Sequence, residues 1–484
     1  MSPSMHGKLL MRLRAPNADR ATLLVPPYAE WSAALLANAD RLASLTARRE
    51  QARREVWQCV RTYHHRLGEP LPPLEPPRIW IVSGHQPELF HAGVWLKNFV
   101  LAGFASRHHS IGLNLVVDND TIKTTTVRLP EGEPLAFDHF HGEQPWEERT
   151  IHDEALFASF PRRLRAVMAR WNLEPLAETF WSLLPTTGML GERFAVARRS
   201  LERLWGCYNA ELPLSWLCET QSFQTFVHEL ISDAPRFAAV YNAVVQAYRA
   251  AHHIKSRNHP VPDLTQQGPW TELPLWTWNA GDQHRQRVFV NARGQYRIRG
   301  EKIRSRALLT TLFARLYLAD WFIHGLGGGL YDQLTDAIVR RYLGIEPPGY
   351  AIVTGSRWLP LPRTGVSWDD WRQQWRRLRD LTYQPERFLD EQSAQQLAPL
   401  IAERQAVLRQ SPSRQQFARQ RALLERIAAP LASQREAVRQ ELAMLEQTLQ
   451  KESRFQRRDY SLVLFPEDSL RPWLTAWLRG NGER

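Results

Sequence analysis

Residues 78–105 read RIWIVSGHQPELFHAGVWLKNFVLAGFA, and residues 112–120 read GLNLVVDND. A short apolar run leads into a polar Gly-His-Gln-Pro loop, apolar residues at helical spacing follow, and a second apolar run ends in acidic residues. This order predicts one β-α-β unit with two parallel strands. Because ligands bind beside the carboxyl ends of such strands in open α/β sheets, we expect the polar residues there to converge. These residues are His85, Gln86, Asp118 and Asp120.

The charge of the chain favours anionic partners. The chain has 484 residues, a length that predicts two or three modules. Its 62 Lys and Arg against 50 Asp and Glu give a net charge of +12. Phosphates, carboxylates and nucleic acid are all attracted by such a charge. The arginine-rich segments, such as residues 371–379, have the spacing of solvated helix faces. We therefore expect an anionic small molecule as partner, with nucleic acid as the less favoured one.

The cysteine and histidine patterns predict no metal site. Cys59, Cys207 and Cys218 include no CxxC pair, so neither a disulfide framework nor a cysteine zinc site is indicated. His253 and His259 lack a carboxylate or cysteine at metal-binding spacing. The start of the sequence lacks a signal-like apolar run, and no run approaches the length of a membrane span. We expect a cytoplasmic protein that does not enter a membrane.

A second β-α-β pattern lies later in the chain. Residues 324–334 read HGLGGGLYDQL, and an apolar run from Gly349 ends in Ser356 and Arg357. Glycines allow close backbone approach to a ligand, although this spacing is neither the dinucleotide GxGxxG pattern nor a P-loop. We expect the glycines and Arg357 to hold a carboxylate or phosphate. The predicted substrate-binding residues are Gln86, Asn98, Asn119, His324, Gly325, Gly327, Gly328, Gly329, Gln333, Ser356 and Arg357.

These patterns predict an α/β fold: a Rossmann-like parallel-sheet core with helical insertions and a C-terminal α-helical coiled-coil arm. A Pro-rich stretch marks the entry to the core. A short opening strand is expected at residues 9–13 and a closing strand at residues 460–467. The expected segments are a covering segment (1–76), the first core half (77–150), a helical insertion (151–262), the second core half (263–365), the arm (366–457) and a tail docking on the core (458–484).

Apolar residues in the arm recur in steps of four and three from Leu424 to Leu449. This heptad pattern predicts a seam that makes the protein a homodimer. Pro430 lies beside the seam and is expected to bend it. The alternative is a helix packed on its own domain, because single chains use the same periodicity.

The order of these parts resembles the bacillithiol-biosynthesis cysteine-adding enzyme family, also called the putative cysteine ligase. Residues 82–86, Val-Ser-Gly-His-Gln, stand where that family has a Gly-Gln-Gln loop, and residues 323–334 stand where it has a Gly-Gly-Pro-Gly-Glu loop and a helix. The likeness continues through residues 344–348 and covers most of residues 78–360, with the arm similar in architecture. It implies a small-molecule ligase that joins cysteine to an amino-sugar malate conjugate or a related substrate.

The sequence departs from that family at functional positions. His85 replaces the first Gln of the loop, Leu330 stands near its Glu, and residues 118–120 replace an acidic-His motif. The cofactor and the energy source are not indicated by any motif.

Three functions follow from these patterns. The leading one is ligation or group transfer, with His85 and Asp118 or Asp120 as acid and base in one cavity that also contains His324 and residues 327–329. The second is a nucleotide- or RNA-binding protein with a coiled-coil dimerisation arm. The third is a catalytically inactive scaffold in which the core only supports the arm. For single residues the alternatives are that the loop after residue 82 is a structural turn beside a helix cap and that Asp120 caps a helix or turn.

Overall fold

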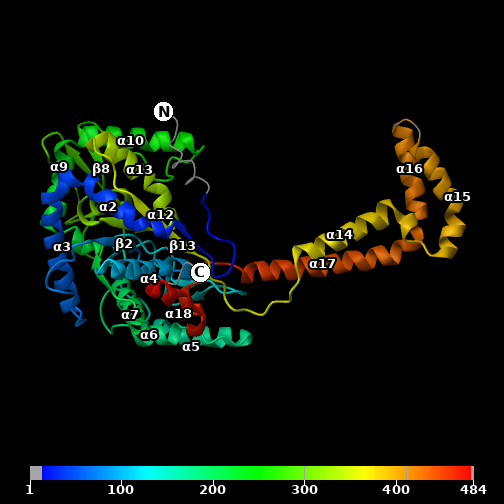
Figure 1. Ribbon diagram of the computed structural model, residues 1–484, viewed down its shortest axis with the longest axis horizontal. Helices are drawn as coiled ribbons and strands as arrows, with labels where there is room; N and C mark the ends of the chain where they lie inside the picture. Colours follow the sequence, from blue (N-terminus) through cyan, green and yellow to red (C-terminus); the bar gives the residue numbers. More distant parts are fainter. Residues whose placement is uncertain (1–12, 299, 410, 412, 481–484) are drawn as a thin grey trace. The chain divides into compact units, whose positions relative to one another are not determined.

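The computed structural model describes residues 13–298, 300–409, 411 and 413–480 (Figure 1). The chain divides into unit 1, which comprises Met1–Pro360 and Arg458–Arg484, and unit 2, which comprises Leu361–Arg457. The strand expected at residues 9–13 lies almost entirely outside the described residues. None of the described helices combines the length and apolar character that a membrane span requires.

Unit 1 is built on a mixed sheet in which parallel strands predominate. The strand order is β1-β13-β12-β2-β3-β6, with β1 antiparallel to β13 and every other neighbouring pair parallel. This sheet confirms the predicted mixed α/β class. The strands are β1 (Thr22–Val25), β13 (Tyr350–Gly355), β12 (Trp321–His324), β2 (Ile81–His85), β3 (Gly112–Val116) and β6 (Asn209–Pro213).

The predicted β-α-β unit is confirmed as β2, α4 (Ala92–Arg107) and β3. His91 is the N-cap of α4: its Nδ1 accepts a hydrogen bond from the backbone N–H of Gly93 at 3.1 Å. The helix is apolar nearly all round and packs across the sheet, with α18 (Glu467–Thr475) against it (Figure 1). A Cβ on Gly93 would lie 2.0 Å from the Gly355 carbonyl oxygen, so glycine is what lets α4 approach β13 this closely.

The order of the parallel strands reverses between β2 and β12. From β2 the chain adds β3 and β6 on one side, and later adds β12 and β13 on the other. In open α/β sheets such a reversal leaves a crevice beside the carboxyl ends of the two central strands. The sheet therefore has a topological switch point between β2 and β12.

Strand β6 differs from the expectation of a helical insertion over residues 151–262. The predicted helices are there, including α5 (Glu154–Met168), α7 (Leu190–Leu204), α9 (Gln221–Ser232) and α10 (Ala234–Ala251), but residues 209–213 form an edge strand beside β3. The buried side chain of Glu211 interrupts the apolar pattern of this strand. Asn114 donates to Glu211 at 2.6 Å, and Arg198 and Arg199 pair with it. Buried partners on α7 and β3 therefore make a charged strand residue tolerable.

The Trp- and Arg-rich segment after residue 262 forms an antiparallel sheet of its own. The strand order is β10-β9-β8-β11, with β8 (Trp270–Trp278), β9 (Gln286–Asn291), β10 (Tyr296–Arg297) and β11 (Lys302–Ser305). Residues 292–294 form the hairpin turn between β9 and β10, and Gly294 takes the left-handed backbone conformation with a φ of +73°.

The amino- and carboxyl-terminal segments also differ in detail from expectation. The covering helix is split into α2 (Trp31–Arg41) and α3 (Thr46–Arg66). The closing strand expected at residues 460–467 reduces to one bridge between Ser461 and His91 followed by the 3-10 turn η8 (Leu462–Leu464). The apolar side chains of that run are buried. Its backbone turns instead of extending, because the Leu462 N–H donates to the Phe90 carbonyl oxygen at 2.8 Å and the Leu464 N–H to the Ser461 carbonyl oxygen at 3.1 Å.

Unit 2 is helical, with α14 (Trp368–Tyr383), α15 (Glu391–Leu408), α16 (Arg414–Ile427) and α17 (Ala432–Phe455). Helix α14 packs on α17, and α15 packs on α16. The seam residues Leu431, Val438 and Leu442 form a buried cluster with Leu381 of α14, so they pack within the chain. Pro430 lies in a 3-10 turn that separates α16 from α17.

Candidate functional site

The two central strands end in histidines that lie at the switch point. β2 ends at His85, β12 ends at His324, and Ile323 of β12 pairs with Ser83 of β2. The parallel register places both carboxyl ends on one edge of the sheet, as the sequence predicts. His85 is half-buried and His324 is buried.

Lys97 completes this cluster and was missed by the sequence analysis. It lies on α4 with 2% of its surface exposed, and its Nζ donates to the Gly84 carbonyl oxygen at 2.7 Å. No carboxylate among the described residues forms an ion pair with it. Burial, assisted by the Arg198 charge, lowers the pKa of Lys97 to about 7. The one signal in the sequence is a lysine inside an otherwise apolar helix.

The ring of His85 is held as a neutral base. Its Nδ1 lies 3.0 Å from the Gln86 carbonyl oxygen, which can only accept, so Nδ1 carries the hydrogen and Nε2 keeps its lone pair. Burial and then the Lys97 charge hold the pKa of His85 well below its ordinary value. Phe90 packs against the ring edge-to-face at 5.1 Å. His85 can therefore accept a proton or hydrogen bond through Nε2.

His324 is oriented by a buried ion pair. Its Nε2 lies 2.9 Å from Asp332 Oδ2, and the same oxygen pairs with the Arg315 guanidinium. Although burial opposes it, Arg315 and then His324 hold the pKa of Asp332 below its usual range. Burial lowers the pKa of His324 despite Asp332, so the neutral ring donates through Nε2 and presents Nδ1 as an acceptor.

The glycine loop begins beside Lys97. Gly325 precedes α12 (Leu326–Tyr331), and a Cβ on it would lie 3.9 Å from the Lys97 methylenes. A Cβ on Gly328 would approach the Nδ1 of His324 at 3.2 Å, whereas one on Gly327 would meet open space. A Cβ on Gly329 would lie 2.3 Å from the Ile352 side chain. Gly329 is therefore needed for packing, and Gly327 faces free volume.

Two predicted anion-binding residues at the end of β13 are engaged elsewhere. Arg357 forms an ion pair with Asp19 at 2.6 Å and donates to the Ser469 carbonyl oxygen at 3.1 Å. The Ser356 hydroxyl donates to the Pro16 carbonyl oxygen. These contacts join the first and last described segments of unit 1 to the sheet. The sequence could not indicate that, because Asp19 lies 338 positions from Arg357.

Three more predicted substrate-binding residues make structural contacts. Asn98 donates to Glu202 at 2.7 Å within a buried polar network. Asn119 donates to the Ser305 carbonyl oxygen at 2.8 Å, and Gln333 donates to the Leu330 carbonyl oxygen at 3.1 Å. The Asn98 bond joins α4 to α7, the Asn119 bond joins the segment after β3 to β11, and the Gln333 bond closes the turn between α12 and α13 (Gln333–Ile338).

The acidic residues after β3 lie in separate surroundings from His85. Asp118 accepts from the Ser215 backbone N–H at 2.9 Å and from its hydroxyl, and it lines a cavity beside β3 and β6. Asp120 accepts from Gln86 Nε2 at 3.0 Å and pairs with Arg285 at 3.2 Å. The expected single cavity is thus two clusters, with the Gln86 to Asp120 hydrogen bond lying along the same edge.

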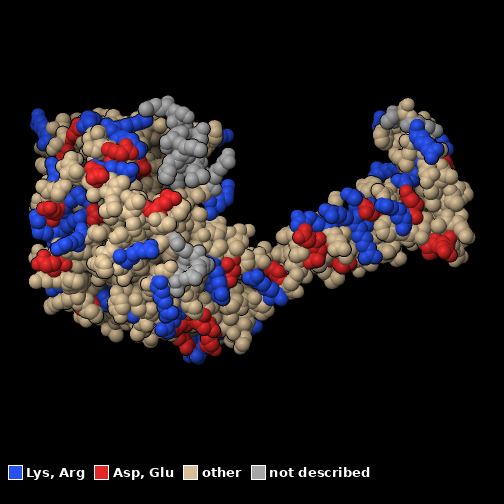
Figure 2. Space-filling view, in the orientation of Figure 1, with Lys and Arg blue, Asp and Glu red and all other residues tan. Residues whose placement is uncertain are grey.

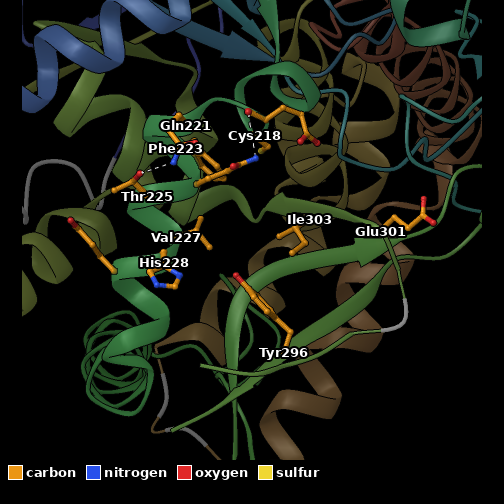
Figure 3. A pocket seen from close by; sticks show the side chains of 12 residues that line it. Cys218, Gln221, Phe223, Thr225, Val227, His228, Tyr296, Glu301 and Ile303 are labelled. Atoms are coloured by element: carbon orange, nitrogen blue, oxygen red, sulfur yellow. Dashed lines mark hydrogen bonds between the residues drawn. The ribbon is translucent and has the colours of Figure 1, made fainter. Parts of the chain in front are cut away.

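A hollow of about 490 Å³ lies along α9 and the edge of β11 (Figure 3). Phe223, Val227, Tyr296 and Ile303 give it a mainly apolar lining, and Gln221 donates to Thr225 within it. Burial raises the pKa of the nearby Cys218 to about 11, which keeps the thiol protonated and poorly nucleophilic. Its lining does not include the basic cluster at the switch point.

No group of three or more His, Cys, Asp or Glu side chains in the described ranges could hold a metal ion. The ring of His141 meets those of His139 and His152 edge-to-face, but the three histidines form no metal-binding set. The chemistry offered by the edge at the ends of β2 and β12 is proton transfer and binding of an anion.

No protein-family model and no curated protein matches the chain.

Proposed function

We propose that this chain is an enzyme of small-molecule ligation or group transfer whose reaction centre lies at the switch point between β2 and β12. The order β6-β3-β2-β12-β13 supports a Rossmann-like core, because doubly wound sheets of that kind have the same reversal. The observation that carries the proposal is Lys97. A buried lysine with a pKa of about 7 and no ion-pair partner in the described structure is typical of a functional site.

Two forms of Lys97 serve such a reaction. The protonated amine attracts a carboxylate or phosphate of the substrate in a place where burial strengthens the attraction. The neutral amine can accept a proton from an attacking amine or thiol at neutral pH. His85 offers the second acceptor through Nε2, and the Gly327 backbone leaves room for a substrate. Asp118 and Asp120 take no part in this cluster.

The substrate class follows from the resemblance to the cysteine-adding family. Two stretches carry this resemblance. Residues 82–86 cover the end of β2, and residues 323–334 cover the end of β12 and the loop and helix that follow it. The proposed reaction joins cysteine to an amino-sugar malate conjugate or a related acid. The carboxylates of such a conjugate suit the Lys97 ammonium.

The test is a condensation assay with the full chain. Cysteine and an amino-sugar malate conjugate are incubated with the protein, with and without ATP, and the product is sought by mass spectrometry at the summed mass less one water. Loss of product with Lys97→Met and retention with Lys255→Met, an exposed lysine in a loop, is the expected result. Equal product formation by both variants would overturn the assignment of Lys97.

Nucleic-acid binding is the second candidate, and one feature of the arm favours it. The exposed face of α14 carries Trp368, Arg372, Trp375 and Arg379 at helical spacing, and such interleaving suits stacked bases. However, basic and acidic side chains are interspersed on the visible face of the arm rather than gathered in one groove (Figure 2). Fluorescence anisotropy with a random RNA tests this function. Binding at physiological salt that weakens steeply as salt rises would favour it over the ligase.

The homodimer is proposed to form through the arm, but on a surface of the arm other than the heptad seam. Because Leu442 packs against α14, a charge there would disturb the chain itself. Phe417 of α16 is 62% exposed and offers an apolar contact to a second copy. Light scattering of Phe417→Asp against the parent protein is expected to show a fall from dimer to monomer mass. A monomer mass for both proteins would rule out this dimer.

A further inference from the structure

The cavity beside the carboxyl ends of β3 and β6 is separate from the switch point. It measures about 180 Å³, and Val116 and Pro213, the last residues of the two strands, form part of its wall together with Asp118 and Ser215. A neighbouring hollow of about 340 Å³ shares Glu147, Ser215 and Trp216 with it. Together they offer the space that a small organic molecule needs.

A buried hydroxyl in this cavity lacks a partner. Tyr63 of α3 is fully buried and lines the cavity, and its hydroxyl has no hydrogen-bond partner among the described residues. Buried polar atoms in folded proteins are nearly always paired, so an unpaired hydroxyl on a side chain that lines a cavity indicates a missing ligand or water. A ligand atom that donates a hydrogen bond would satisfy the Tyr63 oxygen.

The charges around the cavity leave one carboxyl without a counter-ion. Glu147 is paired with Arg304 at 2.9 Å and lies 3.5 Å from Lys302. Asp118 is buried, with 8% of its surface exposed. In the described structure it accepts two hydrogen bonds from Ser215 and forms no ion pair. Burial and then the Glu147 charge raise the pKa of Asp118 above its usual range. A cation placed beside Asp118 would offset both the cost of burying its charge and the repulsion from Glu147.

The aromatic walls of the cavity are already in contact with arginines. The rings of Tyr63 and Trp216 meet edge-to-face at 5.6 Å. The Arg66 guanidinium lies 5.4 Å from the centroid of each ring, and the Arg199 guanidinium lies 5.7 Å from the Tyr63 centroid. Arg66 is half-exposed and paired with Glu192. The rings therefore offer a ligand apolar surface, and the carboxyl of Asp118 is what can balance a ligand charge.

We propose that this cavity binds a small primary amine in its ammonium form, with Asp118 as the counter-charge and the Tyr63 hydroxyl oxygen as a hydrogen-bond acceptor. The aliphatic part of the amine lies against Val116, Pro213 and Trp216. The site does not rest on the proposed ligase activity, because Lys97 and His85 contribute nothing to it.

The test is calorimetric titration of the full chain with butylammonium, using butanol and butyrate as neutral and anionic probes of the same shape. We expect binding of butylammonium and none of the other two at physiological salt. Loss of a charge-assisted hydrogen bond predicts at least about a tenfold weaker affinity for Asp118→Asn and a few-fold weaker affinity for Tyr63→Phe. Glu50→Gln, which alters an exposed carboxyl of the same helix as Tyr63, is expected to bind as the parent does.

A variant at the cavity mouth keeps the test independent of folding at Asp118. Met189 lines the cavity and is 39% exposed, so Met189→Trp fills space without removing a buried polar contact. Weakened butylammonium binding with an unchanged melting temperature supports the site. Equal binding by the parent, Asp118→Asn and Met189→Trp would overturn it, as would tighter binding of butyrate than of butylammonium.

Discussion

Two clusters on the same edge of one sheet are built from opposite charges. Around β2 and β12, Lys97 lies with the neutral rings of His85 and His324; around β3 and β6, Asp118 lies with Glu147. Lys97 is 2% exposed and Asp118 is 8% exposed, and neither has an ion-pair partner in the described structure. Burial lowers the pKa of the first and raises that of the second. One edge can therefore hold an anion at one point and a cation at another.

The buried arginines show what sets these two residues apart. Arg315 and Arg357 are as buried as Lys97, yet each is neutralised by an aspartate within 2.6 Å. Such paired charges hold segments together and have little left to offer a ligand. A buried charge without a protein partner therefore indicates function better than a position at the end of a strand does.

The largest expected effect is the loss of catalysis in Lys97→Met. If Lys97 transfers a proton or holds the anionic group, the substitution is expected to lower kcat/KM by about a thousandfold. The melting temperature is expected to stay level or rise, because a methionine fills the same space without burying an amine. Steady-state kinetics together with thermal melting measure both. A large fall in melting temperature with activity intact would make Lys97 a structural residue.

The stability of the two clusters is expected to respond to pH with opposite signs. The folded-state pKa of Lys97 is about 7, below the 10.5 of a free lysine, so the unfolded chain binds more protons between these values. Relative to Lys97→Met, the parent should gain up to about 1.4 kcal/mol for each pH unit as pH rises from 7 to 10. Urea unfolding at a series of pH values measures the difference. A flat difference curve would show that Lys97 titrates normally.

Asp118 is expected to give the reverse trend at lower pH. Its folded pKa lies above the 3.8 of a free aspartate, so the stabilising effect of its proton is lost as pH rises from about 4 toward neutral. The hydrogen bonds from Ser215 and the charge of Arg304 limit the shift, so the slope is expected only between 3.8 and the folded pKa of about 7. Asp118→Asn should remove this slope in the same unfolding experiment. If the parent instead gains stability over that range relative to Asp118→Asn, the carboxyl is ionised throughout.

Much of the fold could be predicted from the sequence because apolar runs and helical spacing are local signals. The unit β2-α4-β3, the hairpin at Gly294 and the arm helices follow from them. Strand β6 could not, because Glu211 is acceptable there only through buried ion pairs with Arg198 and Arg199, which the sequence pattern does not show. The heptad pattern of α17 is present, but periodicity alone could not indicate that its partner is α14 of the same chain.

The candidate site was predictable only in part, for the same reason. His85 and His324 were found because strand ends converge in any parallel sheet. Lys97 was missed, since a lone lysine in a helix usually extends to solvent. Arg357 and Asn98 were assigned to a ligand because their partners, Asp19 and Glu202, have no sequence signature.

His85→Ala is expected to lower turnover by about a hundredfold while leaving the fold intact. The ring contacts Phe90 and one carbonyl oxygen, so its removal takes little packing from the core. Kinetics and thermal melting of His85→Ala beside His109→Ala, a histidine at a surface turn, measure the two effects. Unchanged turnover would leave Lys97 as the single proton carrier of the cluster.

The smallest expected effect separates the two roles of the glycine loop. Gly329→Ala places a methyl against Ile352 and is expected to cost about 1–3 kcal/mol of unfolding free energy. Gly327→Ala meets open space within α12, so its stability should change by less than about 1 kcal/mol. If a substrate approaches the backbone at this point, the same methyl raises KM a few-fold without altering kcat. An unchanged KM in Gly327→Ala would place the substrate away from the loop, leaving Lys97 and His85 to bind it from the side of β2.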